Sequence, residues 1–176
     1  MKEKIRAAAL KVFDEKGFYK AGIRDIAASA SCSLPTLYYY FKNKEDLFES
    51  SVCDAYEFLV GQIEEQIPEG LPLVDRFYFQ VLQRQLIGDA DKAVFRIALK
   101  MFLGVEGFPA TRERLGAWER RRIGAERRRL MEHYDDPNFA NAVLRVVDNM
   151  LQAIILVGES LTSEQIRAEL ACIIRD

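Results

Sequence analysis

The chain has 176 residues, of which 49% are apolar and 30% charged, so it can bury a sizeable core. Its three cysteines show no C-x-x-C spacing, which excludes the usual zinc and dithiol motifs and favours a reduced, cytosolic setting. The net charge of −2 does not indicate nucleic acid, although residues 1–50 carry nine Lys or Arg against seven Asp or Glu.

The first third of the chain predicts three helices. Apolar side chains recur at helical spacing over residues 2–16, and Gly17 is the expected stop. A second, shorter helix is predicted over residues 23–30, and a three-residue connection leads to a third over residues 34–40. Two short helices joined by so short a turn predict a helix-turn-helix, which the first helix braces.

The stretch Ser33–Lys44 has side chains unlike those of a protein core. Ser33 is a good N-cap, and Pro35 falls in the first turn, where a missing N–H costs little. Leu37 and Phe41 lie four residues apart on one face, so the three consecutive tyrosines between them cannot all be buried. Exposed hydroxyls followed by lysines suit a phosphate-rich surface, so the stretch predicts a DNA contact.

The rest of the chain also predicts helices, separated by Gly and Pro breaks. They cover residues 44–66, 72–87, 91–103, 110–134, 138–159 and 162 onward. With no convincing strand or repeat, the fold class is all-α, with about nine helices. We expect two domains, a helix-turn-helix domain over residues 1–47 and a helical domain over residues 48–176.

Aromatic side chains of the second domain are candidates for an apolar ligand pocket between helices. The candidates are Phe58, Tyr78, Phe95, Phe102 and Trp118. Ordinary core packing explains any one of them equally well, so both interpretations stay open.

The predicted helix over residues 138–159 is apolar on more than one side, which is more than a single intrachain core needs. We therefore expect the last two helices to pair with their symmetry mates in a four-helix bundle. The alternative is a fully buried central helix in a monomer. The interface residues predicted are Phe139, Val143, Val147, Met150, Leu151, Ile154, Ile166, Leu170 and Ile173.

Eight arginines lie between Arg112 and Arg129 in one predicted helix. The simpler interpretation is a solvated helix face, ion-paired with Glu113, Glu119 and Glu126. The alternative is an anion site, because arginine forks suit carboxylate and phosphate groups.

No nucleophile–base pair, metal-ligand spacing or phosphate loop is present in the sequence. We therefore predict no enzyme, no catalytic residue, no metal and no cofactor. The start of the chain lacks the apolar run of a signal peptide, and the longest apolar stretch, Ala153–Gly158, is too short to span a bilayer. No membrane partner is expected.

At residues 5–47 the sequence resembles the N-terminal DNA-binding region of the TetR/AcrR family of bacterial regulators. The ordered string of matching residues is highly specific and covers about a quarter of the chain. The rest of the chain is similar to the family only in its length and helical layout. The matching residues are Ala8-Ala9, Phe13, Glu15-Lys16-Gly17-Phe18, Ile23-Arg24-Asp25-Ile26-Ala27, Ser33-Leu34-Pro35-Thr36-Leu37-Tyr38-Tyr39-Tyr40-Phe41 and Lys44-Glu45-Asp46-Leu47.

The resemblance implies a homodimeric repressor with two reading heads, a C-terminal effector-binding and dimerisation domain, and release from a palindromic operator when a small molecule binds. It also implies a bacterial cytoplasmic protein that is associated with the nucleoid when bound to double-stranded DNA. One alternative is a DNA-binding regulator without an effector, whose second domain only dimerises or binds a protein partner. Activation in place of repression is another. By position, the predicted DNA-binding residues are Arg24, Ser33, Leu34, Pro35, Thr36, Tyr38, Tyr39, Tyr40, Lys42 and Lys44.

Two positions depart from the family pattern. Ala21-Gly22 stand where the family often has Thr or Ser, so a hydroxyl cap for the second helix is missing. Ser31 stands where a glycine is common in the turn, which predicts some backbone strain at this residue.

Overall fold

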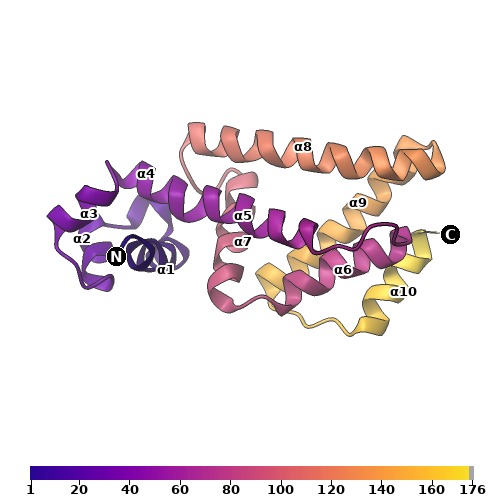
Figure 1. The fold of residues 1–176 in the computed structure, drawn as a ribbon, viewed down its shortest axis with the longest axis horizontal. Coiled ribbons are helices and arrows are strands. Elements are labelled where there is room, and N and C mark those ends of the chain that lie inside the picture. Colours follow the sequence, from indigo (N-terminus) through magenta and orange to yellow (C-terminus); the bar gives the residue numbers. More distant parts are fainter. Residues whose placement is uncertain (175–176) are drawn as a thin grey trace. The chain divides into compact units, whose positions relative to one another are not determined.

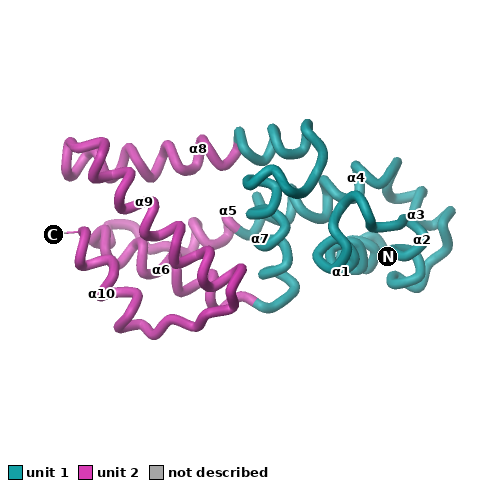
Figure 2. The backbone as a smooth tube through the Cα atoms, turned by 180° about the vertical axis from the view of Figure 1, so that it is seen from behind, with its two compact units in different colours: residues 1–59, 88–117 teal, residues 60–87, 118–176 magenta. Residues whose placement is uncertain are grey.

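The structure is a computed structural model that describes residues 1–174. Those residues contain helices and no strand, which confirms the predicted all-α class, and they form nine continuous helical runs. The chain divides into two compact units, coloured separately in Figure 2. The first holds residues 1–59 and 88–117, and the second holds residues 60–87 and 118 onward. A domain boundary at residue 47 stays a prediction.

The first unit contains the three N-terminal helices (Figure 1). They are followed by a continuous helical run in which a π-helical segment, η1, joins α4 to α5, as predicted for one long helix from Lys44. The elements are α1 (Lys2–Lys20), α2 (Ile23–Ser29), α3 (Leu34–Tyr40), α4 (Lys44–Phe48), η1 (Glu49–Cys53), the start of α5 (Asp54–Glu65), α7 (Asp89–Phe102) and the start of α8 (Pro109–Tyr134).

Gly17 interrupts α1, in agreement with the predicted stop. Its φ of 74° lies in the left-handed region, and a Cβ there would meet the Oε1 of Glu106 at 2.4 Å. Beyond this break the backbone N–H of Phe18 donates to Glu106, and the Phe18 ring packs edge-on against Phe48. The glycine therefore lets the chain fold back so that Phe18 joins the core of the unit.

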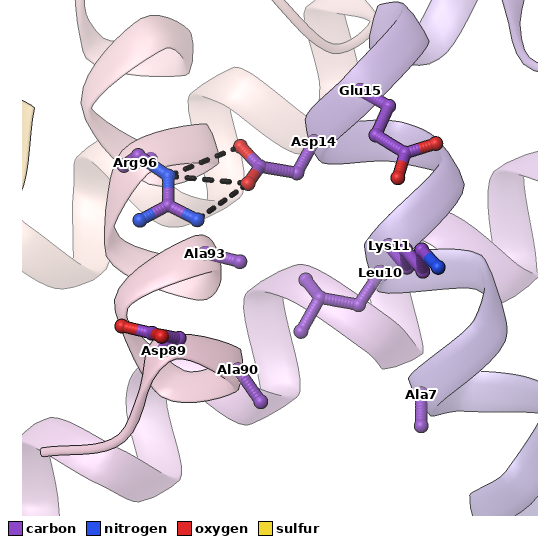
Figure 3. Close-up of a pocket in the computed structure, with 9 residues that line it drawn as sticks. All are labelled: Ala7, Leu10, Lys11, Asp14, Glu15, Asp89, Ala90, Ala93 and Arg96. Atoms are coloured by element: carbon purple, nitrogen blue, oxygen red, sulfur yellow. Dashed lines mark hydrogen bonds and ion pairs between the residues drawn. The ribbon is translucent and has the colours of Figure 1, made fainter.

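Ion pairs between side chains connect helices α1 and α7 within the first unit. Arg96 on α7 donates two hydrogen bonds to the Oδ2 of Asp14 on α1, at 3.1 and 2.6 Å, and Lys100 lies 3.8 Å from Asp14 Oδ1. Beside this pair lies a pocket of about 350 Å³ (Figure 3). The pocket is lined by apolar and charged residues of α1 and α7, namely Ala7, Leu10, Lys11, Asp14, Glu15, Asp89, Ala90, Ala93 and Arg96.

The second unit contains the rest of α5 and α8 together with α6 (Leu73–Leu86), α9 (Pro137–Gln152), η2 (Ala153–Val157) and α10 (Ser163–Ile173). Helix α10 packs against α6 and α9. Its start is a capping box, in which Thr162 and Gln165 each bond the other's backbone N–H. Asp136 likewise caps α9 by accepting from two backbone N–H groups.

Helix α9 and η2 form one helical run of 21 residues, Pro137–Val157. The sequence-based expectation considered only its last part, Ala153–Gly158; by length and composition the whole run is apolar enough to cross a membrane. One such helix is weak evidence, because core helices of soluble proteins pass the same test.

A cluster of charged side chains is buried in the second unit, between α5, α6 and α8. Arg76 donates to Glu64 and to Glu126, each at 2.8 Å, and Gln80 donates to the same two carboxylates at 3.0 and 3.3 Å. Glu126 is 4% exposed and Gln80 is 2% exposed. The predicted position of Glu126 on a solvated face of its helix is therefore wrong, because this side chain is buried against an arginine of another helix, although it also lies 3.9 Å from Arg129 of its own helix.

Burial acts to raise the pKa of Glu126, but the hydrogen bond and charge of Arg76 outweigh it, so the pKa lies below its usual value. For Glu64, burial and the neighbouring charge of Glu126 raise the pKa. The two carboxylates are held close together because Arg76 and Gln80 donate to both. The integrity of the cluster therefore depends strongly on Arg76.

Most residues predicted for the dimer interface are part of the intrachain core. Val143, Val147, Met150, Ile154, Ile166 and Leu170 are each at most 6% exposed in the single chain. Side chains already buried by their own protomer add almost no further area on dimerisation, so these six are corrected to core positions. Phe139, Leu151 and Ile173 are half-buried and keep surface for a partner.

Candidate nucleic-acid interface

Helix α3 is capped as the sequence predicts. The Ser33 hydroxyl accepts the backbone N–H of Thr36 at 3.2 Å, and the two hydroxyls lie 2.8 Å apart. Pro35 occupies the first turn, where no N–H is needed. The Ser33 and Thr36 hydroxyls, both predicted DNA contacts, are therefore already hydrogen-bonded to each other in the free protein.

The buried and exposed faces of α3 separate as predicted. Leu37 is 0% exposed and Phe41 2%, whereas Tyr38 is 51% exposed and Tyr39 81%. Tyr40 is half-buried, and its ring packs edge-on against Tyr39 at 4.9 Å. The core anchors α3 through two side chains, so its proline and first two tyrosines face solvent on a short, rigid helix.

The N-cap residue of α2 is Gly22, and no side chain caps the helix, as predicted from the absence of a Ser or Thr hydroxyl at this place. Arg24 is exposed in its first turn, and the next residue, Asp25, pairs with Lys16 of α1 at 2.7 Å. The hydrogen bond and charge of Lys16 lower the pKa of Asp25. This pair ties α2 to the bracing helix and leaves Arg24 pointing to solvent beside α3.

Lys44 takes a position that the sequence did not indicate. Its ammonium lies 3.4 Å from the Tyr19 carbonyl oxygen and 4.6 Å from the centre of the Phe18 ring. Burial lowers the pKa of this amine. To reach a phosphate, the ammonium has to leave this cation–π contact with the end of α1.

The start of α4 is also occupied by protein groups. Asn43 accepts the N–H of Asp46 at 2.8 Å, and the Asp46 carboxylate accepts the N–H of Lys42 at 2.8 Å. Sequence reasoning placed Asp46 in the first turn of this helix but missed the Asn43 cap, although Asn followed three residues later by an acid indicates a capped helix start. The Asp46 charge makes this helix terminus less favourable for a phosphate than a bare one.

The turn between α2 and α3 contains the strain predicted at Ser31. Its φ is 51°, one of two positive φ values for non-glycine residues among the residues described. We expect Ser31→Gly to raise the free energy of unfolding by about 0.5–1 kcal/mol, because glycine adopts this conformation without the steric cost to Cβ. Thermal melting checks this.

Ser29→Gly is the matched control for that substitution, since Ser29 is exposed but lies in α2. It is expected to lower stability through helix propensity. If both glycine variants shift the melting temperature downward, the strain at Ser31 is not significant.

The five predicted pocket residues are divided between the two units, with Phe58, Phe95 and Phe102 in the first and Tyr78 and Trp118 in the second. Phe95 is buried and Phe102 is 37% exposed, and both pack edge-on against Tyr56. Phe58 is 63% exposed. The Tyr78 hydroxyl in the second unit donates to the Ser163 hydroxyl at 3.0 Å, and Trp118 is half-buried in the same unit. The pocket between α1 and α7 is lined by other residues.

Comparison with known proteins assigns the N-terminal region. Residues 5–50 match the family model described as bacterial regulatory proteins, tetR family. The probable HTH-type transcriptional regulator YttP of Bacillus subtilis is 41% identical over 56 residues, which cover 32% of this chain and 27% of that protein. The negative regulator of the biofilm operon icaADBC, IcaR of Staphylococcus aureus, is 37% identical over 59 residues, which cover 34% of this chain and 32% of that protein. The chain thus spans about a third of the length of the curated relatives it matches.

Solved structures match the fold over nearly the whole chain. A TetR-like transcriptional regulator from Rhodococcus sp. RHA1 has a TM-score of 0.75 at 19% identity and covers 97% of this chain and 91% of its own. The multidrug binding protein EbrR, complexed with malachite green, has a TM-score of 0.75 at 21% identity, and the match covers 100% of this chain and 99% of that one. These relatives are regulators and binding proteins, in agreement with the prediction that the chain is not an enzyme. Residues 5–50 thus match the tetR family of bacterial regulatory proteins, as the sequence resemblance predicted, and the whole chain shares its fold with TetR-like regulators.

Proposed function

We propose that this protein is a ligand-responsive transcriptional repressor that binds a palindromic operator as a homodimer and is released by a small molecule. The observation that carries the DNA-binding part is the division of α3. Leu37 is completely buried, while Tyr38 and Tyr39, directly after it, are exposed. A rigid helix with proline, tyrosine and threonine on its outer side can enter a major groove and hold phosphates on both of its edges.

Within this proposal, α3 offers few hydrogen bonds to base edges. Ser33 and Thr36 bond each other, and Leu34 and Pro35 are apolar. Sequence preference then comes from methyl contacts, from the exposed Arg24 and from DNA shape. The predicted phosphate contacts are those of Tyr38, Tyr39, Tyr40, Lys42 and Lys44.

Dimerisation is proposed through the outer sides of the last two helices. After the six buried residues are removed, α9 and η2 still present small and apolar side chains on their outer sides, beside the polar Arg145, Asp148 and Asn149, and α10 also presents small side chains. The small and apolar residues are Ala142, Val146, Ala153, Leu156 and Val157, followed on α10 by Ala168, Ala171 and Cys172. Small side chains let helices approach closely, so these positions suit a symmetric helix pair better than those first predicted.

The effector part of the proposal is supported by the fold and by one neighbour. EbrR, which shares the fold, was solved with malachite green and is called a multidrug binding protein. In this chain the aromatic cluster of Tyr56, Phe95 and Phe102 offers apolar surface of the kind that lines ligand pockets. The second candidate function, a regulator without an effector, is favoured by the buried ion cluster, which fills the space between α5, α6 and α8 with protein groups.

Binding to the DNA directly upstream of the gene tests the proposed function. Fluorescence anisotropy is expected to show nanomolar, salt-sensitive binding to a palindrome with half-sites about one helical turn apart. Absence of such binding across the upstream region contradicts the proposal. A panel of small molecules, screened by thermal melting, separates the two candidates, since an effector raises the melting temperature and weakens operator binding together.

A further inference from the structure

Helix α8 has an exposed surface made only of arginines. Between residues 114 and 131, every exposed residue is an arginine, namely Arg120, Arg121, Arg127, Arg128 and Arg129. The two acidic residues of this segment are engaged elsewhere: Glu126 turns inward to Arg76 and reaches Arg129 at 3.9 Å, and Glu119 pairs with Arg122. Arg121, Arg127 and Arg128 form no ion pair within residues 1–174, which the structure describes. The nearest exposed acid along the helix is Glu132, four residues after Arg128.

Gly124 lies at the centre of this surface. On an α-helix its nearest surface neighbours are the residues three and four positions away, and all four of these are arginines: Arg120, Arg121, Arg127 and Arg128. We call these four arginines and the glycine the Gly124 face. All of them belong to the second unit, and all lie on one continuous helix.

The glycine has no packing reason within the chain. A Cβ at Gly124 would meet only the Nη1 of Arg128, at 3.9 Å, so alanine fits without a clash. Glycine in a helix interior costs about 1 kcal/mol relative to alanine. The missing side chain leaves a shallow depression between two pairs of arginines, which a bound group can enter.

The charges of the Gly124 face indicate an anionic polymer. The whole chain has a net charge of −2, so a basic composition does not explain four cations gathered around one residue. Guanidinium forks bind phosphate oxygens in a bidentate way. The two arginine pairs are seven residues apart, about 10.5 Å along the helix axis. Along one strand of a duplex, the two phosphates that flank a given phosphate are roughly 6.8 Å apart along the axis, a span that long arginine side chains on either side of Gly124 can reach.

We propose that the Gly124 face binds the phosphate backbone of a nucleic acid, with one phosphate seated over Gly124 and its neighbours held by the arginine pairs. The contact does not depend on base sequence and is separate from the helix-turn-helix. It supplies a second anchoring surface in the C-terminal half of the chain.

The test uses the full chain with Arg121, Arg127 and Arg128 replaced by glutamine; none of these three forms an ion pair among the residues described. Anisotropy is measured with a labelled random-sequence duplex and a single strand at several salt concentrations. We expect at least a tenfold loss of affinity at low salt, and a slope of log K against log salt lower by about 2–3 for the duplex. Circular dichroism confirms that the variant is folded.

Two variants that keep the charge sharpen the test. Arg→Lys at the same three positions keeps the positive charge but not the planar fork, so affinity is expected to fall only severalfold. Gly124→Leu keeps all four arginines but fills the depression, and is expected to weaken binding about as much as the triple glutamine variant. If Gly124→Leu binds like wild type, no phosphate is seated over the glycine and the proposal fails.

Three further outcomes decide the matter. An unchanged affinity and salt slope in the triple glutamine variant overturns the proposal. The proposal is also overturned if wild-type protein binds a glutamate-rich peptide more tightly than either nucleic acid and the triple glutamine variant does not bind this peptide. That result favours an acidic protein partner. The Tyr38→Ala, Tyr39→Ala double variant separates the two surfaces, because the probe contains no operator. If this double variant still binds the probe, and the binding is lost when the three arginines are also replaced by glutamine, the result supports the proposal.

Discussion

Replacing Arg76 by alanine is expected to lower the free energy of unfolding by about 3–5 kcal/mol at neutral pH. Arg76 donates to both Glu64 and Glu126, and its side chain is 13% exposed. Removing it leaves two neighbouring carboxylates inside the second unit that share Gln80 as a donor, while the remaining cations are farther away, Arg122 at 3.8 Å from Glu64 and Arg129 at 3.9 Å from Glu126. Chemical denaturation, followed by far-ultraviolet circular dichroism, measures the change.

The pH dependence of that loss identifies its cause. Without Arg76, burial and mutual repulsion raise the pKa of the carboxylate pair above the unfolded value. A raised pKa favours the folded state as pH falls, so the deficit of the variant should shrink from pH 8 to pH 5. Arg145→Ala, an exposed arginine of α9, is the control and should change stability by at most about 0.5 kcal/mol. A deficit that does not depend on pH indicates lost packing and not an unpaired charge.

The double substitution Tyr38→Ala and Tyr39→Ala is expected to weaken operator binding by about 10- to 100-fold while leaving the fold intact. Both rings are mostly exposed, so removing them costs little core packing. A dimer loses two hydroxyls at each of its two half-sites, so a net contribution of about 0.5 kcal/mol per hydroxyl gives a loss of about 2 kcal/mol, or roughly 30-fold. Anisotropy with the operator duplex measures the loss.

Phenylalanine at the same two positions removes only the hydroxyls and should account for most of the effect. Phe58→Ala, an exposed aromatic of α5, is the matched control and should bind the operator like wild type. If the double alanine variant binds the operator as tightly as the Phe58 control, α3 is not the reading helix.

The sequence alone determined the local features of the reading head. Periodicity placed the three N-terminal helices, the Ser33 cap, the buried Leu37 and Phe41, and the exposed tyrosines, because each depends on neighbours within about four residues. The matching string also predicted the family. The strain at Ser31, seen as a positive φ, was predicted from the resemblance, because the family commonly has a glycine at this position of the turn.

Tertiary structure decided what depends on distant residues. Lys44 turns to the ring of Phe18 and the carbonyl of Tyr19, and Glu126 turns inward to Arg76 fifty residues away. The apolar residues of α9 and α10 became intrachain core because α6 packs against both helices, which no periodicity shows. A pattern along the chain indicates which face of a helix is apolar or charged, but the partner of that face is chosen only when helices meet in space.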